Sequence, residues 1–326
     1  MRIAVLGAGA WGTALAISFA GRHAVSLWAR AEDCPNEMAQ ARENRRFLPG
    51  FPFPASLQVE PDLAVALVRA DLAILAAPLA GFRGLLEQLR EHAPELAFLW
   101  VCKGLEAGSG LLPHQVVAAV GSKAPCGVLT GPSFALEVAR GLPTAVALAS
   151  RDAAFAAETA HSLHGGNLRI YAHEDLIGAE VGAAVKNVLA IATGICDGLG
   201  LGLNARAALI TRGLSEITRL GEALGARRET FMGLAGVGDL ILTCTGDLSR
   251  NRQVGLRLAE GVALDEIVRQ LGHIAEGVPA AREVARRAAE LGVEMPITRA
   301  VTAVLDGRIT PREAVEQLMA RDAKHE

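Results

Sequence analysis

A glycine-rich loop between a strand and a helix limits this chain to a small set of folds. Residues 2–6 have the apolar pattern of a short buried strand, and residues 12–20 have that of an alanine-rich helix. Between them, Gly7, Gly9 and Gly12 form a GxGxxG pattern. Glycines at this spacing allow a tight turn, a close approach of backbone N–H groups to a pyrophosphate, and close packing of the helix on the strand. The pattern therefore predicts a dinucleotide-binding site near the N-terminus.

The same region carries no charged residue from Ile3 to Gly21, a stretch of 19 residues. An uncharged stretch of that length is also typical of a signal peptide or a membrane span. Its three glycines and the single basic residue before it, Arg2, argue against both. A second strand-like segment follows at residues 24–28, at the distance expected in a βαβ unit. We therefore favour the cofactor loop and expect no membrane span, with a glycine-rich turn in another kind of α/β protein as the alternative.

Strand-like and helical segments alternate up to about residue 150. Strand patterns recur at residues 72–76, 98–102, 127–129 and 144–149, and helical stretches such as 82–92 separate them. Such alternation predicts a mostly parallel sheet covered by helices, in which ligands bind beyond the carboxyl ends of the strands. We expect residues 77–78, 103–104 and 131–133 at that edge.

After about residue 172 the pattern changes. From Ala179 onward the apolar residues follow a helical period, with breaks at 198–202, 233–238 and 272, and no further strand pattern. Residues 310–313 form a capping box that begins the last expected helix. The predicted fold class is α/β: an N-terminal Rossmann-type parallel-sheet domain, residues 1–172, followed by an all-α domain, residues 173–326.

Composition narrows the functional classes. Of 326 residues, 51% are hydrophobic and 21% are charged, and the formal net charge is −3. These values exclude a disordered or strongly basic protein, so we expect no nucleic-acid partner. The five cysteines form no CxxC pair, which fits a reducing cytoplasm and gives no zinc pattern. His161 and His164 lack convergent acids or cysteines, and we expect no metal.

Lysine is scarce, which makes its positions informative. Only four of the 32 basic residues are lysines, and the others are arginines. Lys186 lies inside the apolar helical stretch 181–195. Burial lowers the pKa of an amine unless a carboxylate supports its charge, and a tuned amine suits a general acid or base. Lys103 follows the strand pattern at 98–102, at the ligand edge. The alternatives are a lysine that snorkels out of its helix and a surface-loop lysine.

Two later segments carry further polar candidates. Residues 233–239 superficially repeat a glycine fingerprint, but no strand precedes them, so we interpret them as a helix break that positions Asp239. Residues 243–251 are expected to form a loop that enters a helix, with Ser249 as its N-cap. Arg250, Asn251 and the free amides at that helix start would form a local anion site suited to a phosphate. A simple capped surface helix is the alternative.

The end of the second strand bears on the choice of cofactor. NAD-specific enzymes usually carry Asp or Glu there for the ribose 2′-hydroxyl. This chain has Trp28 and Arg30, with acids only at Glu32 and Asp33. Because an arginine can pair with a 2′-phosphate, NADPH is favoured and NADH stays open. An ordinary surface arginine is the alternative.

Several short motifs occur in a fixed order along the chain. They are GAGAWGTALA at 7–16, FLPG at 47–50, KG at 103–104, GPSFA at 131–135, KN at 186–187 with DG at 197–198, LAGVGD at 234–239, SRNR at 249–252 and EG at 276–277. In this order they resemble the bacterial soluble NAD(P)-dependent glycerol-3-phosphate dehydrogenases, over nearly the whole chain. The resemblance implies reversible NAD(P)H-dependent reduction of dihydroxyacetone phosphate to sn-glycerol 3-phosphate, which supplies phospholipid synthesis.

The resemblance also implies roles for individual residues. Lys186 would be the general acid in reduction and the base in oxidation, Lys103 would hold substrate and cofactor, and Asp239 would orient the lysines. The substrate-binding positions would be Lys103, Gly131, Ser133, Lys186, Asp239, Ser249, Arg250 and Asn251. The cofactor-binding positions would be Gly7, Gly9, Ala10, Trp11, Gly12, Arg30, Lys103, Ala135, Arg250, Ile274 and Glu276.

Departures from the family pattern leave the charged groups in place. Ala10 stands where many relatives have serine, and Cys102 where threonine is common. Two other functions stay open: a related hydroxyacid or sugar-acid dehydrogenase of the same two-domain plan, and a non-catalytic dinucleotide sensor. We expect a small-molecule substrate as the partner, and a homodimer is an open alternative to a monomer.

Overall fold

The computed structural model of the chain describes residues 1–271 and 275–322. The chain folds into two compact units. The first comprises Met1–Lys103 and Leu111–Ala179, and the second comprises Gly104–Gly110 and the chain from Glu180 onward. The second unit thus includes a short segment from the middle of the region expected to form the N-terminal domain, and it begins a few residues after the expected boundary at 172.

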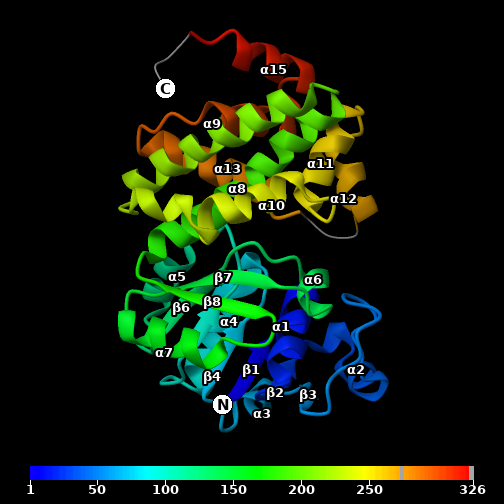
Figure 1. Cartoon of the computed structure of the whole chain (residues 1–326), viewed down its shortest axis with the longest axis vertical. Coiled ribbons are helices and arrows are strands. Elements are labelled where there is room, and N and C mark those ends of the chain that lie inside the picture. The colour runs from blue at the N-terminus through cyan, green and yellow to red at the C-terminus, as the bar shows by residue number, and fades with distance from the viewer. Residues whose placement is uncertain (272–274, 323–326) are drawn as a thin grey trace. The chain divides into compact units, whose positions relative to one another are not determined.

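The first unit is built on one sheet of eight described strands (Figure 1). They are β1 (Arg2–Leu6), β2 (Ala24–Trp28), β3 (Leu57–Glu60), β4 (Leu72–Leu75), β5 (Phe98–Trp100), β6 (Cys126–Thr130), β7 (Thr144–Ala149) and β8 (Leu168–His173). Their order is β3-β2-β1-β4-β5-β6-β7-β8. Neighbouring strands are parallel except β6 and β7, which are antiparallel. The predicted mostly parallel sheet is confirmed.

Helices connect these strands. The first unit contains α1 (Ala10–Ala20), the 3₁₀ turn Ala31–Asp33, α2 (Pro35–Ala41), α3 (Leu63–Leu67), α4 (Leu79–His92), α5 (Pro113–Val120), α6 (Ala135–Ala139) and α7 (Ala153–Leu163). Two expected helices begin earlier than their apolar patterns suggested, α1 at Ala10 and α4 at Leu79. Helix α1 packs against β2 and α6, and α4 packs against β4 and α5.

Strands β3 and β8 were not predicted from the sequence, and both are edge strands of the sheet. In β8, buried Leu168 and Ile170 alternate with exposed Arg169 and Tyr171. An edge strand packs and pairs on fewer sides than a central strand, so its sequence carries a shorter apolar pattern. The continuous apolar runs used to find the other strands are for this reason absent from these two.

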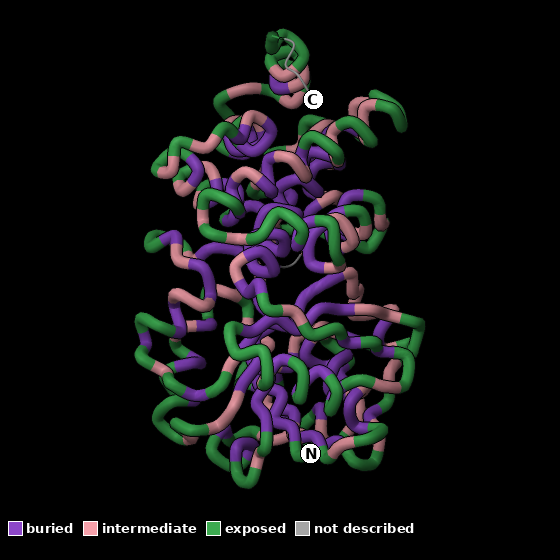
Figure 2. The backbone as a smooth tube through the Cα atoms, turned by 60° about the vertical axis from the view of Figure 1, so that its left-hand side comes forward, coloured by how far each residue is buried: buried purple, intermediate pink, exposed green. Residues whose placement is uncertain are grey.

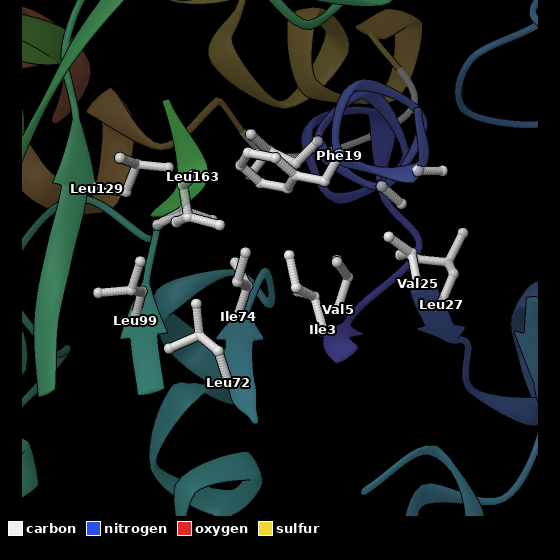
Figure 3. Packing of buried hydrophobic residues seen from close by; sticks show 14 of the residues in the cluster. Ile3, Val5, Phe19, Val25, Leu27, Leu72, Ile74, Leu99, Leu129 and Leu163 are labelled. Atoms are coloured by element: carbon white, nitrogen blue, oxygen red, sulfur yellow. The ribbon is translucent and has the colours of Figure 1, made fainter. Parts of the chain in front are cut away.

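The core of the first unit packs side chains from one face of the sheet against α1 and α7, as Figure 3 shows. Phe19 of α1 is fully buried in it. The strands contribute pairs of residues at alternate positions, because successive side chains of a strand point to opposite faces: Ile3 and Val5, Val25 and Leu27, and Leu72 and Ile74. This packing fixes the end of β1 and the start of α1, and so the glycine loop between them.

The described part of the second unit contains helices and turns but no strand, as predicted. Its elements are α8 (Leu176–Gly198), α9 (Gly202–Ala223), the 3₁₀ turn Arg228–Met232, the π-helical turn Leu234–Gly238, α10 (Asp239–Thr245), α11 (Arg250–Ala259), α12 (Leu264–Leu271), α13 (Gly277–Glu290), α14 (Pro296–Leu305) and α15 (Pro311–Met319). Helix α8 begins in the first unit and continues into the second.

Helix α8 is long and apolar enough to cross a membrane by length and composition, with a mean hydropathy of 1.4 over its most apolar window. In the structure, 94% of that window is buried inside the protein, and buried segments run through the interior of each unit (Figure 2). We therefore interpret α8 as a core helix. The uncharged stretch Ile3–Gly21 forms β1 and α1 of the first unit.

Two glycines bring α8 into backbone contact with α11. A Cβ atom on Gly194 would lie 2.1 Å from the carbonyl oxygen of Arg252, and one on Gly255 would lie 2.1 Å from that of Ile191. No side chain fits at either position without moving a backbone. The helix that carries Lys186 therefore lies directly against the helix that begins at Arg250.

Candidate active site

The glycine loop has the geometry of a nucleotide cradle. Gly7 has a φ of +121°, and a Cβ there would lie 2.8 Å from the carbonyl oxygen of Ala76. A Cβ on Gly12 would lie 2.0 Å from the carbonyl oxygen of Gly7, so the helix can approach the strand only without a side chain. A Cβ on Gly9 would meet no atom of the described residues within 4 Å. Backbone atoms therefore leave no room for a side chain at the first and third glycines, whereas the space beside the second glycine can accept a ligand.

The first backbone N–H groups of α1 lie next to Gly9, and no acidic side chain in the first turn offsets their partial charge. Gly9 is the N-cap of this helix, no side chain of the described residues caps it, and its first turn, which includes Ala10 and Trp11, holds no acidic residue. The first N–H groups of a helix lack intrahelical partners and carry a partial positive charge, which favours an anion. The open cradle and the free helix start fit a pyrophosphate.

Asn44 holds the glycine loop in place through hydrogen bonds. It was not among the predicted site residues. Its buried Nδ2 donates to the carbonyl oxygen of Ala8 at 2.7 Å and to Thr13 Oγ1 at 2.8 Å. Its Oδ1 accepts from the backbone N–H of Phe47 at 3.1 Å. The contacts with Ala8 and Thr13 span more than 30 residues of sequence, so no local pattern signals them.

The carboxyl ends of β1, β4, β5 and β6 lie at one edge of the sheet, because these strands are parallel. Gly131 follows β6 with a φ of +142°, and a Cβ there would lie 3.0 Å from the Cα of Val146. Ser133 Oγ donates to the carbonyl oxygen of Gly131 at 2.9 Å, which folds this turn back on itself. Ala135 begins α6 and packs near Trp11 and Ala14 of α1.

Lys103 and Arg30 are the two basic residues among the predicted site residues of the first unit. Lys103 is half-buried and follows β5 along the chain, at the same edge. Arg30 follows β2, and its exposed guanidinium lies 2.6 Å from Glu32 Oε1 and 3.2 Å from Asp33 Oδ2. Both acids noted near Arg30 in the sequence therefore pair with it.

The central feature of the second unit is a buried ion pair. Lys186 Nζ donates to the carboxylate of Asp239 and, at 2.9 Å, to Thr243 Oγ1. The side chains of Lys186 and Asp239 are only 7% and 1% exposed. A buried ammonium is costly unless a carboxylate and further hydrogen bonds satisfy it. Asp239 is the supporting carboxylate that the apolar surroundings of Lys186 required.

The local fold explains how Asp239 and Thr243 reach Lys186. The π-helical turn Leu234–Gly238 leads into α10, whose first residue is Asp239, as the expected helix break predicted. Thr243 lies four residues later on the same helix face, and its hydroxyl donates to the carbonyl oxygen of Asp239 at 2.7 Å. The expected loop at 243–251 is wrong at its start, since α10 continues to Thr245. The i,i+4 spacing of Asp239 and Thr243 is the signal that would have found this threonine.

Cys244 adjoins Thr243 on α10 and is buried. Burial raises the pKa of its thiol to about 12. The thiol stays protonated at neutral pH, and we exclude Cys244 as a nucleophile.

Asn251 lies in a second buried network. Its Nδ2 donates to Asn187 Oδ1 at 3.0 Å, and its Oδ1 accepts from the backbone N–H of Gly277 at 2.9 Å. Asn187 follows Lys186 on α8, and Glu276, half-buried, is the N-cap residue of α13. The starts of α11 and α13 are thus held against α8 next to the lysine.

The start of α11 carries two arginines that differ in their contacts: Arg252 forms ion pairs, and Arg250 forms none with the described residues. Ser249 Oγ accepts from the backbone N–H of Arg252 at 3.3 Å, which confirms the predicted N-cap. Arg252 donates to Asp197 at 3.0 and 2.8 Å and pairs with Asp247 at 3.0 Å. Arg250 is exposed and forms no ion pair with the described residues. Its charge is available to an anionic ligand.

The predicted site residues thus fall into two groups. Gly7, Gly9, Ala10, Trp11, Gly12, Arg30, Lys103, Gly131, Ser133 and Ala135 lie in the first unit, and Lys186, Asp239, Ser249, Arg250, Asn251 and Glu276 lie in the second. Each group occupies neighbouring elements of its own unit. Ile274 lies outside the described residues.

A cavity of about 690 Å³ lies in the second unit between α8, α9, α14 and α15. Its lining is mostly apolar, with Ile195, Leu209 and Val301 among the residues, and it includes none of the predicted site residues that the structure describes. Among residues 1–271 and 275–322, no group of three or more His, Cys, Asp or Glu residues is placed to hold a metal.

Comparison with known proteins gives one consistent family. A family model described as NAD-dependent glycerol-3-phosphate dehydrogenase N-terminus matches residues 2–156, and the corresponding C-terminus model matches residues 175–316. Proteins named glycerol-3-phosphate dehydrogenase (NAD(P)+) from Dechloromonas aromatica and Aromatoleum aromaticum are 64% and 60% identical to this chain, and the alignments cover all of it and 99% and 100% of those relatives. The crystal structure of glycerol-3-phosphate dehydrogenase from Coxiella burnetii has a TM-score of 0.94 at 43% identity, with 98% of this chain and 99% of that chain covered. The chain therefore belongs to the NAD(P)-dependent glycerol-3-phosphate dehydrogenase family.

Proposed function

We propose that this chain catalyses the reversible NAD(P)H-dependent reduction of dihydroxyacetone phosphate to sn-glycerol 3-phosphate, which supplies glycerophospholipid synthesis. The observation that carries the proposal is the buried pair of Lys186 and Asp239. Reduction of a carbonyl needs a proton donor at the oxygen, and a protonated amine held in an apolar helix can supply one. Membership of the family supports the identity of the substrate.

The first unit would hold the nucleotide. The open cradle at Gly9 and the free amides of α1 fit the pyrophosphate. Arg30 would lie at the adenosine ribose, and Trp11, Lys103 and Ala135 are further cofactor positions, with Arg250, Ile274 and Glu276 as those from the later part of the chain. When bound, the nicotinamide supplies the hydride that is transferred to C2 of the substrate. We expect NADPH to be preferred and NADH to be accepted.

Lys186 would supply the proton. In reduction its Nζ gives a proton to the C2 oxygen, and in oxidation the neutral amine takes the proton back. Asp239 stabilises the ammonium form and, with Thr243, fixes the direction of the amine. Lys103 would add a second positive charge that favours the developing alkoxide, and Gly131 and Ser133 would contact the substrate.

The start of α11 would bind the substrate phosphate. Arg250 is a cation with no carboxylate partner among the described residues, and it lies beside the first amides of the helix. Asn251 uses one Nδ2 hydrogen for Asn187 and retains the second for a ligand. Ser249 caps the same helix and completes the cluster.

The two alternative functions are not favoured. A hydroxyacid or sugar acid without a phosphate would leave Arg250 without a role. A sensor without catalysis has no need of a buried amine paired with a carboxylate.

Within the proposal, residues 1–172 form the dinucleotide-binding domain, which also contributes Lys103, Gly131 and Ser133 to the substrate. Residues 173–326 form the substrate and catalytic domain, which also contributes Arg250, Ile274 and Glu276 to the cofactor. We also place the enzyme in the cytoplasm, since none of the five cysteines forms a disulfide, and we keep a homodimer as its proposed assembly.

The test is the oxidation of NADPH and of NADH, followed by absorbance, with dihydroxyacetone phosphate and with dihydroxyacetone as substrates. We expect turnover of the phosphorylated substrate with a much higher kcat/KM than its dephosphorylated form. Equal use of both substrates would exclude the phosphate site, and no oxidation of either nucleotide would exclude the dehydrogenase.

A further inference from the structure

We propose that Arg46 is a second arginine for the 2′-phosphate of NADPH, and that Asp33 holds Arg30 and Arg46 together at this position. The inference rests on the proposed function, because it refines the nucleotide site of the first unit. It identifies the groups by which the enzyme would distinguish NADPH from NADH.

Asp33 joins the two arginines. Arg30 Nε lies 3.2 Å from Asp33 Oδ2, and Arg46 Nη1 lies 3.4 Å from Asp33 Oδ1. The carboxylate side chain is only 8% exposed, whereas the arginine side chains are 59% and 61% exposed. One buried acid therefore holds two guanidinium groups that remain open to solvent.

Arg46 is oriented by two further contacts. Its Nη1 donates to the carbonyl oxygen of Glu32 at 2.9 Å, and its guanidinium carbon lies 4.8 Å from the centre of the Phe47 ring. A guanidinium has five N–H donors in a planar fork, and Arg46 directs one nitrogen at these protein oxygens. Its other donors can bind the oxygens of a phosphate.

The segment that carries Arg46 is fastened to the nucleotide cradle. Asn44, two residues earlier, donates to the carbonyl oxygen of Ala8 in the glycine loop. Leu48, two residues later, packs with Ala14 and Trp11 of α1. Arg46 is thus held between two anchors on the loop and helix that fit the pyrophosphate, and it reaches the residues that follow β2.

The end of the second strand is where this fold places the 2′ group of the adenosine ribose. NAD-specific enzymes have a free carboxylate there that accepts a hydrogen bond from the hydroxyl. In this chain both oxygens of Asp33 face arginines. The acid therefore positions cations for a phosphate and is not free to bind a hydroxyl.

Arg45 provides a matched control for Arg46. It is the adjacent residue in the same segment, its side chain is 74% exposed, and its Nε lies 3.4 Å from Glu43 Oε2. Arg45→Ala and Arg46→Ala remove the same charge from neighbouring positions. A difference between them reports the position of the guanidinium, and a general electrostatic effect would be the same in both.

The experiment measures dissociation constants by calorimetry for 2′,5′-ADP, 5′-ADP, NADPH and NADH, so that it does not depend on turnover. For Arg46→Ala we expect about tenfold weaker binding of 2′,5′-ADP and NADPH, the size of one charge-assisted hydrogen bond, and unchanged binding of 5′-ADP and NADH. Arg45→Ala should leave all four constants unchanged. Asp33→Asn should weaken the two 2′-phosphorylated ligands and spare the other two.

Two results would overturn the inference alone: wild-type affinity for 2′,5′-ADP in Arg46→Ala, or an equal loss for all four ligands, which would mark Arg46 as a structural residue. A wild-type protein that binds none of the four nucleotides would overturn the proposed nucleotide site itself. A wild-type protein that oxidises NADPH with dihydroxyacetone phosphate, together with unchanged binding in Arg46→Ala, separates failure of this inference from failure of the proposed function.

Discussion

Lys186 is the residue on which the proposed chemistry depends. Replacement of its whole side chain, amine included, by a methyl group in Lys186→Ala should lower kcat by about 10³-fold, in the range expected for loss of a general acid. The dissociation constant for NADPH should stay within about twofold, because the nucleotide cradle belongs to the first unit. Steady-state kinetics and a fluorescence titration with NADPH measure the two quantities.

Lys123 offers the control for this substitution, since it is a lysine that the proposed site does not use. Lys123→Ala should retain wild-type kcat. Circular dichroism must show that Lys186→Ala is folded, because the change leaves the buried Asp239 without its cation. A folded Lys186→Ala enzyme with more than a tenth of wild-type kcat would be incompatible with the proton-transfer role.

Arg250 should act on substrate affinity rather than on the chemical step. Arg250→Ala is expected to raise the KM for dihydroxyacetone phosphate by about tenfold to a hundredfold, the free-energy range of a hydrogen bond between charged groups. With saturating NADPH, which offsets a weaker cofactor contact of Arg250, its kcat/KM for dihydroxyacetone should not change, because that substrate lacks the phosphate. Arg257→Ala, in the last turn of the same helix, is the control and should alter neither constant. If Arg250→Ala lowered kcat/KM equally for both substrates, the assignment of Arg250 to the substrate phosphate would be wrong.

At the scale of elements, local sequence rules locate helix starts well. Thr310 Oγ1 accepts from the backbone N–H of Glu313 at 3.2 Å, and Glu313 Oε2 accepts from that of Thr310 at 2.6 Å, so the predicted capping box begins α15. Ser249 likewise caps the start of α11. Both signals depend on residues within one turn of each other, and they are for this reason readable in the sequence.

The contact between α8 and α11 gives a prediction about packing. In Gly194→Ala the new Cβ would lie 2.1 Å from a backbone oxygen that cannot move alone, and we expect the protein to lose about 2 kcal/mol or more of unfolding free energy. Gly84→Ala is the matched change in α4, where a Cβ would meet no atom within 4 Å in the part of the chain that the structure describes. That variant should gain about 0.5–1 kcal/mol, because alanine restricts the unfolded chain.

Urea titrations followed by circular dichroism compare the two alanine variants with the wild type. Equal stability of Gly194→Ala and the wild type would show that α8 and α11 do not approach each other as closely as described. A kcat loss in Gly194→Ala larger than that of Gly84→Ala is also expected, because the contact joins the helices that carry Lys186 and Arg250.

At the scale of the whole molecule, the buried Glu216 should make stability depend on pH. It joins α9 to the start of α14, where it accepts from the backbone N–H groups of Ile297 at 2.6 Å and Thr298 at 3.1 Å. Burial raises the pKa of Glu216 above its ordinary value of 4.5, and these hydrogen bonds offset only part of that rise. In the native state the carboxyl group therefore binds its proton more tightly than in the unfolded state.

The sign of the effect follows from this difference. Between the ordinary pKa and the raised one, the native state holds more protons, so its unfolding free energy falls as pH rises. Each unit of pKa difference contributes about 1.4 kcal/mol. Glu216→Gln cannot ionise and should remove this slope, whereas Glu222→Gln, at a more exposed position on α9, should keep it. Urea titrations from acid to neutral pH measure the slopes, and identical slopes for wild type and Glu216→Gln would contradict the assignment.

Much of the whole fold was predictable because it depends on local periodicity. The glycine loop, the central strands and the change to an all-helical second unit all follow from apolar spacing and turn residues. The edge strands β3 and β8 were not predicted, because several of their residues are exposed and their apolar patterns are short. Strand β7 lies antiparallel to β6. The direction of this pairing cannot be predicted from the sequence of either strand, because it depends on how the two segments meet.

The glycine loop, the helix caps and a lysine inside an apolar helix can all be recognised in the sequence, because each depends on residues close together in the chain. The carboxylate that supports this lysine is known only from the fold: Asp239 lies 53 residues away and reaches Lys186 where α10 meets α8. The fold is also needed to see that Asn44 binds the glycine loop and that Asp33 contacts both Arg30 and Arg46. Burial and ion pairing depend on distances in space, and these distances are fixed only when the helices and strands pack.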